Sequence, residues 1–333
     1  MPTLYITQHG DVLRHRQKRL IVERNGQEII TMPLAHVERV VLLGNAVMTT
    51  PTAKFLLYHG VDVVFLTENG AYCGRLTGPF ARDGALRRRQ YAASLHPELA
   101  LQIAKDCVGG KLRNMRTQLL RYRREHGQVQ LDPAIEQLER AGRTIEQASH
   151  KNSLLGYEGS ASAVYFRALP LMLKRDWGFT KRVRQPPTDP VNVLLSFAYT
   201  LLFKQMEAAV QLVGLDPYIG FLHEPLHGRA SLALDLIEEF RPIIADSVVL
   251  RCLNSELITP ADFSPSNQPQ RPIVLSQAGV QRLISEFENR MNTELQHPVT
   301  GEKSSYRRCF ELQAYAMAHA VRHGQPYLPL LTR

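Results

Sequence analysis

The sequence predicts an α+β protein with a small N-terminal β-rich domain followed by a larger all-helical catalytic domain. Residues 1–78 consist mainly of short alternating or β-branched runs, whereas residues 86–333 carry apolar side chains at helical spacing. Gly78 and Pro79 mark the change, so we expect a linker over 79–85. A chain of 333 residues is long enough to form two hydrophobic cores.

The N-terminal domain is expected to contain a series of short strands. Asn25 and Gly26 lie between two β-branched runs, which is typical of a type I′ hairpin, and Asn69 and Gly70 repeat that signal. The predicted strands cover 3–7, 20–23, 28–31, 37–43, 61–66 and 71–77.

Capping residues indicate where several helices begin and end. Thr50 is a suitable N-cap and Gly60 a suitable stop for one helix within the β domain. Asp189 can cap a helix that begins at Pro190 and stops before Gly214. The other predicted helices cover 84–94, 97–125, 132–146, 158–174, 229–240, 242–253, 276–295 and 303–323, with a polar loop over 262–270.

The composition is typical of a globular protein, with 44% hydrophobic and 21% charged residues. We find no apolar run of 18 residues and no apolar signal core at the N-terminus, so we expect a cytoplasmic protein without a membrane span. Cys73, Cys107, Cys252 and Cys309 form no CxxC pair, which predicts free, mostly buried thiols and no zinc finger.

Positive charge is concentrated in one segment. The chain has a net charge of +9, and residues 82–124 hold eleven Lys or Arg against three acidic residues. Such a segment can be a solvated helix face, but its imbalance favours binding to a phosphate backbone. We take Arg87, Arg88 and Arg89 as DNA-binding candidates.

The stretch 220–242 is the most informative for chemistry. His223 is expected in a loop, and Gly228 precedes a helix on which Asp235 and Glu238 lie three residues apart, opposite the apolar face. These carboxylates can simply be a polar outer face. Together with the imidazole they can also hold Mn²⁺ or Mg²⁺, which accept mixed oxygen and nitrogen ligands. Arg229 is a further DNA-binding candidate.

Two other stretches carry chemistry-bearing residues. Glu158 lies between Gly156 and Gly159, where helical patterning begins, and its position alone predicts only a favourable interaction with the helix dipole. Residues 174–192 combine basic and aromatic side chains, which suits either a surface loop or a grip on a DNA backbone with base stacking. The candidates there are Lys174, Arg175, Trp177, Lys181, Arg182 and Arg184.

Motifs of other enzyme classes are absent from the sequence. It contains no GxxxxGK[ST] loop, no GxGxxG after a strand, no GxSxG elbow and no HExxH. Nucleotide hydrolysis, dinucleotide binding and serine hydrolase chemistry are therefore not indicated.

These stretches, in this order, resemble the CRISPR-associated integrase family of spacer acquisition, "Cas-one". The likeness rests on LLGYEGSASAVYF at 154–166, PVNVLLSFAYTLL at 190–202 and GFLHEPLHGRASLALDLIEEFRP at 220–242. The last stretch also looks like members of the type I-C system. The resemblance implies that Glu158, His223 and Glu238 are the metal ligands, with Asp235 as a further catalytic residue close by.

The resemblance also implies partners and a reaction. Family members form homodimers, expected here through the β domain, and assemble with a small ferredoxin-like partner, "Cas-two", on double-stranded protospacer and repeat DNA. The implied activity is insertion of spacers into a CRISPR array for antiviral defence, by attack of a 3′-hydroxyl on a phosphodiester. A structure-selective repair nuclease and a non-catalytic DNA-binding scaffold remain alternatives.

Overall fold

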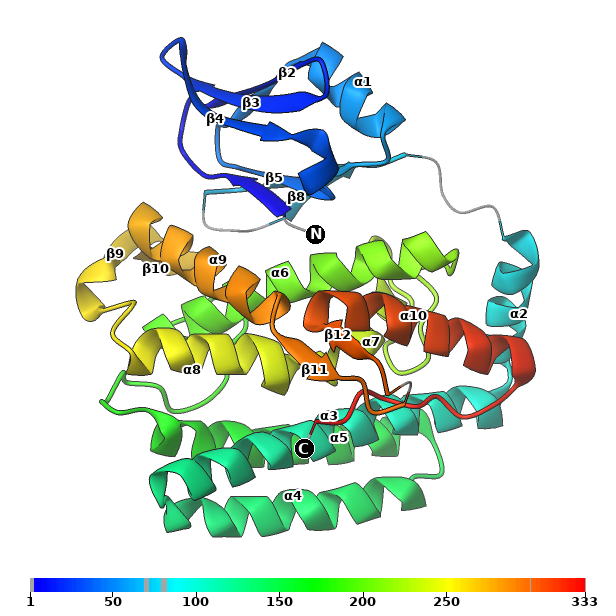
Figure 1. The fold of residues 1–333 in the computed structure, drawn as a ribbon. Coiled ribbons are helices and arrows are strands. Elements are labelled where there is room, and N and C mark those ends of the chain that lie inside the picture. Colours follow the sequence, from blue (N-terminus) through cyan, green and yellow to red (C-terminus); the bar gives the residue numbers. More distant parts are fainter. Residues whose placement is uncertain (1–2, 69–71, 79–82, 300, 333) are drawn as a thin grey trace.

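A β-rich domain stands on one side of a larger helical domain, as predicted (Figure 1). The structure is a computed structural model, and it describes residues 3–68, 72–78, 83–299 and 301–332. The hairpin predicted at Asn69 and Gly70 and the basic residue Arg82 lie outside these ranges.

The N-terminal domain contains two four-stranded sheets and one helix. One sheet has the order β1-β5-β7-β8 and the other β4-β3-β2-β6. Asn25 and Gly26 have φ angles of 50° and 80°, which confirms the type I′ signal between β3 and β4. The elements are β1 (Thr3–Ile6), β2 (Val12–Arg16), β3 (Arg19–Arg24), β4 (Gln27–Pro33), β5 (Arg39–Leu43), β6 (Val47–Met48), α1 (Thr50–Tyr58), β7 (Asp62–Leu66) and β8 (Tyr72–Leu76).

Strands β5 and β7 belong to two hydrophobic cores at once. Side chains alternate across a strand, so Val40 and Val63 face the core of the β domain, while Val41 and Val64 face the core of the helical domain. This explains why these runs are apolar throughout instead of alternating with polar residues. The β domain is therefore packed onto the helices through a buried sheet face.

The helical domain is built around α3 and α6. Helix α6 is long and apolar enough to cross a membrane, but 72% of its apolar window is buried inside the protein, as in a core helix. The helices are α2 (Gly84–Leu95), α3 (Pro97–His126), α4 (Asp132–Thr144), α5 (Lys151–Ala168), α6 (Pro190–Val213), α7 (Ser231–Ile237), α8 (Ser247–Asn254), α9 (Gln277–Met291) and α10 (Tyr306–His323).

Several expectations about local structure were wrong. Thr49, not Thr50, precedes helix α1. Helix α5 begins at Lys151, seven residues before Glu158, so Glu158 lies within the helix and not at its start. The predicted loop at 262–270 forms the hairpin of β9 (Phe263–Gln268) and β10 (Arg271–Leu275). The strands β2, β6, β11 (Glu294–Gln296) and β12 (Lys303–Ser305) were not predicted either.

The cysteines agree with the sequence prediction. Cys107, Cys252 and Cys309 are free and buried, whereas Cys73 is exposed.

The C-terminal segment returns across α3 (Figure 1). The Asn114 side chain donates hydrogen bonds to the carbonyls of Glu239 and Leu330, and it accepts one from the Thr332 backbone amide. Gly110, one turn earlier, leaves room for Pro329. This close approach fastens the end of the chain against the middle of α3.

We expect Gly110→Ala to destabilise the protein, because the new Cβ would lie 2.5 Å from Pro329 Cβ and 3.3 Å from Glu239 Cβ. Overpacking of this kind costs about 1–3 kcal/mol of unfolding free energy, which urea denaturation can measure. The matched control is Gly109→Ala, whose Cβ would lie 3.6 Å from Ile145 Cδ1 and which gains up to about 1 kcal/mol in helix propensity. Equal stability of the two variants would contradict this packing.

Candidate active site

A buried carboxylate shapes the loop that carries His223. Asp235 is 1% exposed and accepts backbone hydrogen bonds from Phe221, Leu222 and His223 at 2.5, 3.0 and 2.9 Å. Gly220 is needed for this approach, because a Cβ there would lie 2.7 Å from Asp235 Oδ2 and 2.8 Å from the Ser231 carbonyl carbon. The loop that carries His223 is therefore folded back against helix α7 by its hydrogen bonds to Asp235.

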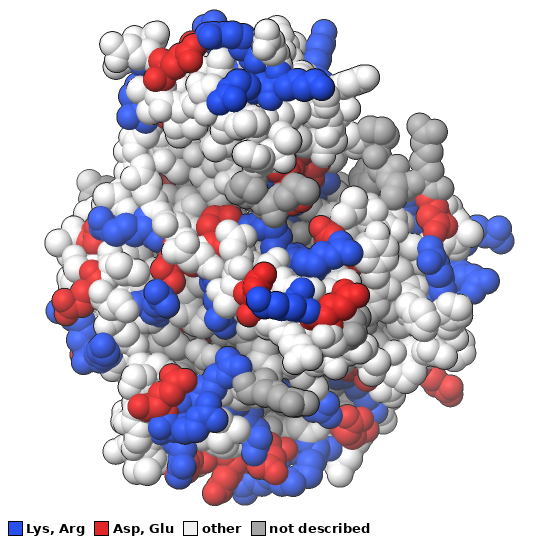
Figure 2. Space-filling model, in the orientation of Figure 1, with Lys and Arg blue, Asp and Glu red and all other residues white. Residues whose placement is uncertain are grey.

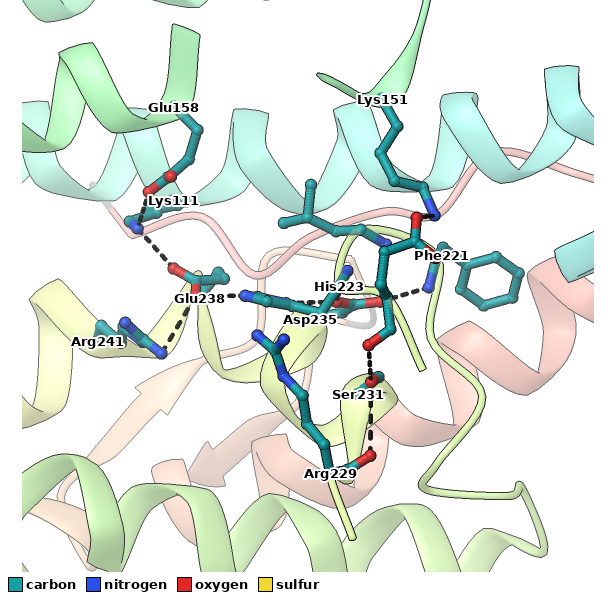
Figure 3. A network of polar contacts seen from close by, with 12 residues as sticks. Lys111, Lys151, Glu158, Phe221, His223, Arg229, Ser231, Asp235, Glu238 and Arg241 are labelled. Carbon is teal, nitrogen blue, oxygen red and sulfur yellow. Dashed lines mark hydrogen bonds and ion pairs between the residues drawn. The ribbon is translucent and has the colours of Figure 1, made fainter. Parts of the chain in front are cut away.

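The same carboxylate orients the imidazole. His223 Nδ1 lies 2.7 Å from Asp235 Oδ1, and since an ionised carboxylate can only accept, Nδ1 donates the proton. The Nε2 lone pair is then available as a ligand, and it lies 4.0 Å from Glu238 Oε1 (Figure 3). Asp235 thus acts through His223, as carboxylates behind metal-binding histidines do. The catalytic role that the resemblance implies for Asp235 stays a prediction.

Glu238 follows one turn after Asp235 and is surrounded by cations. Its side chain is only 4% exposed, with Arg241 Nη2 3.2 Å from Oε1 and Lys111 Nζ 2.6 Å from Oε2. Burial alone would raise the pKa of Glu238, but Arg241, Lys111 and His223 lower it to about 2. Glu238 is therefore an ionised carboxylate in a buried place and not part of a solvated outer face.

Glu158 approaches the same place from α5. Its Oε1 accepts hydrogen bonds from Ser162 Oγ at 2.7 Å and from Lys111 Nζ. Burial opposes ionisation, yet the nearby Lys111 ammonium keeps the pKa of Glu158 below its usual value. Figure 3 shows Lys111 between the two glutamates, with His223 on the far side of Glu238.

Lys111 is the site residue that sequence reasoning missed. We had counted it within the basic segment expected to face DNA, but its side chain is 4% exposed and points into the protein. The available signal was periodicity: Lys111 lies four residues after Cys107 and four before Met115, both buried on α3. A lysine on the buried stripe of a helix indicates an internal anion.

The donor set fits a divalent cation of the Mn²⁺ or Mg²⁺ kind, with two ionised carboxylates and one imidazole nitrogen. Glu238 Oε2 is buried and lies 2.6 Å from Lys111 Nζ. Across those ranges, no three His, Cys, Asp or Glu side chains stand together as a finished metal-ligand group. The structure brings Glu158, His223 and Glu238 to one place but holds a lysine among them.

Glu239, next in the chain, faces away from this site. It is buried against α10 and the C-terminal segment, where Oε1 accepts hydrogen bonds from Gln313 Nε2 at 2.9 Å and Tyr327 OH at 3.0 Å. Burial raises the pKa of Glu239 to about 8. Two adjacent glutamates are thus kept in opposite protonation states near neutral pH, because only Glu238 is surrounded by cations.

The basic candidates on α2 and α3 form no continuous stripe. Arg87 donates to the Gly214 carbonyl at 3.1 Å, whereas Arg88 and Arg89 are exposed. On α3, Arg116 and Arg123 pair with acidic residues of α4. Figure 2 shows acidic and basic side chains interspersed on the visible face of the helical domain.

The candidates around 174–184 divide into exposed and structural residues. Lys174, Arg175, Lys181 and Arg184 are exposed, and Arg229 is partly exposed just before α7. Arg182 instead hydrogen-bonds Asn192 and Ser196 on α6.

Trp177 is 7% exposed and packs edge-on against Phe263. Burial of this ring removes support for base stacking, while phosphate contacts by the exposed cations stay predictions.

Comparisons with known proteins agree with the fold. A family model described as "CRISPR associated protein Cas1" matches residues 4–289. "CRISPR-associated endonuclease Cas1 3" of Thermus thermophilus is 38% identical over 331 residues, covering 99% of this chain and 95% of that protein. A solved "Cas6-RT-Cas1--Cas2 complex" contains a chain with 26% identity and a TM-score of 0.83, of which the match covers 36%, against 99% of this chain. A CAS1 protein from Thermotoga maritima shares the fold at 22% identity and a TM-score of 0.83, over 98% of each chain.

We expect Asp235→Asn to lose about 2–3 kcal/mol of unfolding free energy, because a charged acceptor of several hydrogen bonds is replaced by a neutral group whose amide faces backbone donors. Urea denaturation checks this value. The matched control is Asp216→Asn, since Asp216 accepts one backbone hydrogen bond, from Tyr218, and lies in the preceding loop. A loss no larger than that of the control would contradict the role given to Asp235.

We expect Glu239→Gln to gain stability relative to wild type as pH rises from 4.5 to about 8. In that window the unfolded chain releases the proton that folded Glu239 retains, so wild-type stability falls with pH through this group, by up to about 1.4 kcal/mol per pH unit. The Glu239→Gln variant has no ionisable group at this position, so this pH-dependent loss of stability is absent from it. Urea denaturation at several pH values measures the difference, and a difference independent of pH would show that Glu239 ionises normally.

Proposed function

Because the chain belongs to the family of CRISPR-associated Cas1 proteins, we propose that it is a metal-dependent DNA endonuclease and integrase. It would insert short segments of foreign DNA into a CRISPR array as part of antiviral defence. The observation that carries this proposal is the convergence of Glu158, His223 and Glu238 on one buried place, with the imidazole already oriented by Asp235.

The two carboxylates and His223 Nε2 would hold Mn²⁺ or Mg²⁺. When bound, such an ion would supply Lewis-acid stabilisation of the attacked phosphate and favour the alkoxide form of the nucleophile. The oxygen of a 3′-hydroxyl on the captured duplex forms the new bond to phosphorus, and the 3′-oxygen of the repeat strand leaves. Exposed cations such as Arg88 and Lys181 would hold DNA phosphates without reading bases.

The assembly is part of the same proposal. The β domain would form a homodimer, and a small ferredoxin-like partner would join two such dimers on double-stranded DNA in the cytoplasm. Support comes from the likeness to a chain in the Cas6-RT-Cas1--Cas2 complex, at 26% identity. Membership of the type I-C branch stays a prediction.

Two alternatives make different demands on the site. A structure-selective repair nuclease would use the same ligands with water as the nucleophile, and would cut without joining. A non-catalytic scaffold would need no such ligands, and burying several charges for no purpose is costly. The buried Glu238 and the partly buried Glu158, both held ionised by neighbouring cations, therefore favour an enzyme.

We expect Glu158→Gln, His223→Ala and Glu238→Gln each to reduce Mn²⁺-dependent joining of a 3′-hydroxyl duplex to a supercoiled repeat plasmid by about 100-fold or more, since a metal contributes several kcal/mol to such a reaction. Gel analysis of joined and nicked products gives the rates. The control is Glu239→Gln, which changes the next carboxyl group but faces Gln313 and Tyr327 instead.

The assay also separates the alternatives. Full joining by all three ligand variants would refute the site, while cutting without joining by wild type would favour the repair nuclease. If the wild-type protein binds DNA but neither cuts nor joins it in Mn²⁺, that result would favour the scaffold.

A further inference from the structure

Lys111 lies between two of the three side chains that we propose as metal ligands. Its Nζ is hydrogen-bonded to Glu158 Oε1 and lies 2.6 Å from Glu238 Oε2, so one ammonium group joins two of the three proposed ligands. These glutamates come from different helices, α5 and the turn after α7. We call the space between these two oxygens the cation position.

The contact with Glu238 is close and charge-assisted. Lys111 Nζ lies 2.6 Å from Glu238 Oε2, within hydrogen-bond distance, and this ammonium group helps to lower the pKa of Glu238. One ammonium group is therefore in contact with both carboxylates. A buried side chain at 4% exposure is also not presented to a DNA phosphate.

We propose that the Lys111 ammonium and the divalent metal ion occupy the same cation position and exclude each other. The lysine holds Glu158 and Glu238 together in the metal-free protein, and it leaves when the metal binds. This inference rests on the proposed function, because it assumes that these glutamates are metal ligands.

The physical reason is crowding of like charge. A bound Mn²⁺ or Mg²⁺ ion lies about 2.1 Å from carboxylate oxygens, so it cannot share Glu158 Oε1 and Glu238 Oε2 with an ammonium group already in contact with both. The divalent ion interacts more strongly with the pair because it carries twice the charge. With the lysine in place, the described residues contain no assembled group of three ligands.

The lysine therefore lowers metal affinity while protecting the metal-free fold. Without Lys111 or a metal ion, the ionised carboxylates of Glu158 and Glu238 would repel each other, although Arg241 Nη2 still lies 3.2 Å from Glu238 Oε1. Exchange of the Lys111 ammonium for the metal ion ensures that the two carboxylates always have a cation between them. The metal must compete with Lys111, so its measured affinity is weaker than the three ligands alone would give.

The test measures Mn²⁺ binding to the full-length chain by isothermal titration calorimetry. We expect Lys111→Met to bind Mn²⁺ about tenfold or more tightly than wild type, because the competing charge is gone. In EDTA the same variant should melt at a lower temperature than wild type, and saturating Mn²⁺ should remove that difference. The matched control is Lys105→Met on the same helix, whose ammonium contacts the Glu146 carbonyl, and it should bind Mn²⁺ as wild type does.

The outcomes separate this inference from the function on which it rests. Equal or weaker Mn²⁺ binding by Lys111→Met would overturn the inference alone, and would mean that the lysine orients the carboxylates for the metal. Absence of Mn²⁺ binding by the wild-type protein would overturn the proposed metal chemistry, and the inference with it.

A second measurement avoids the variant, should Lys111→Met not fold. Wild-type protein is treated with an amine-acylating reagent with and without saturating Mn²⁺, and modified lysines are identified by mass spectrometry. Lys111 should be protected without metal and modified with it, while Lys105 should be modified equally in both. Continued protection of Lys111 at saturating Mn²⁺ would overturn the exclusion.

Discussion

The carboxylate of Asp235 is the interaction on which the site depends. It accepts three consecutive backbone N–H groups and one imidazole N–H, all from the loop that precedes its own helix. A single buried charge thus fixes the course of the loop and the tautomer of His223. Glu238 takes its place one turn later, so its distance from His223 follows from the same helix. The ligand geometry is therefore determined largely within one short stretch of chain.

The sequence predicted those structural features whose residue patterns lie within one short stretch of chain. Periodicity and caps predicted the two domains and most helices, because those signals lie within ten to twenty residues. They failed at 263–275, where a polar hairpin lacks apolar alternation, and at Glu158, whose helix begins earlier than its apolar pattern suggests. The pair His223 and Glu238 was readable from one stretch. For Lys111, periodicity could indicate burial, but its contacts could not be predicted, because Glu158 and Glu238 meet it only in the folded chain.

Charge counting along the sequence was misleading for the same reason. The excess in 82–124 suggested one DNA-facing stripe, yet its members differ in their surroundings. Lys111 is internal, Arg116 and Arg123 pair with α4, and Arg88 and Arg89 remain exposed. The net charge of a segment counts all its charged residues equally. Binding to a polyanion depends only on those charges that are exposed and not neutralised by an acidic neighbour.

The two-sided burial of β5 and β7 has a consequence for how the molecule works as a whole. Val41 and Val64 are covered by the helical core, and two hydrogen bonds cross the same junction, from Tyr5 to Glu288 and from Arg307 to Thr3. A hinge at this junction would have to expose apolar side chains and break these bonds together. The contacts at this junction therefore oppose a hinge motion between the two domains. A molecule bound to the β sheets would accordingly lie at a set distance from His223.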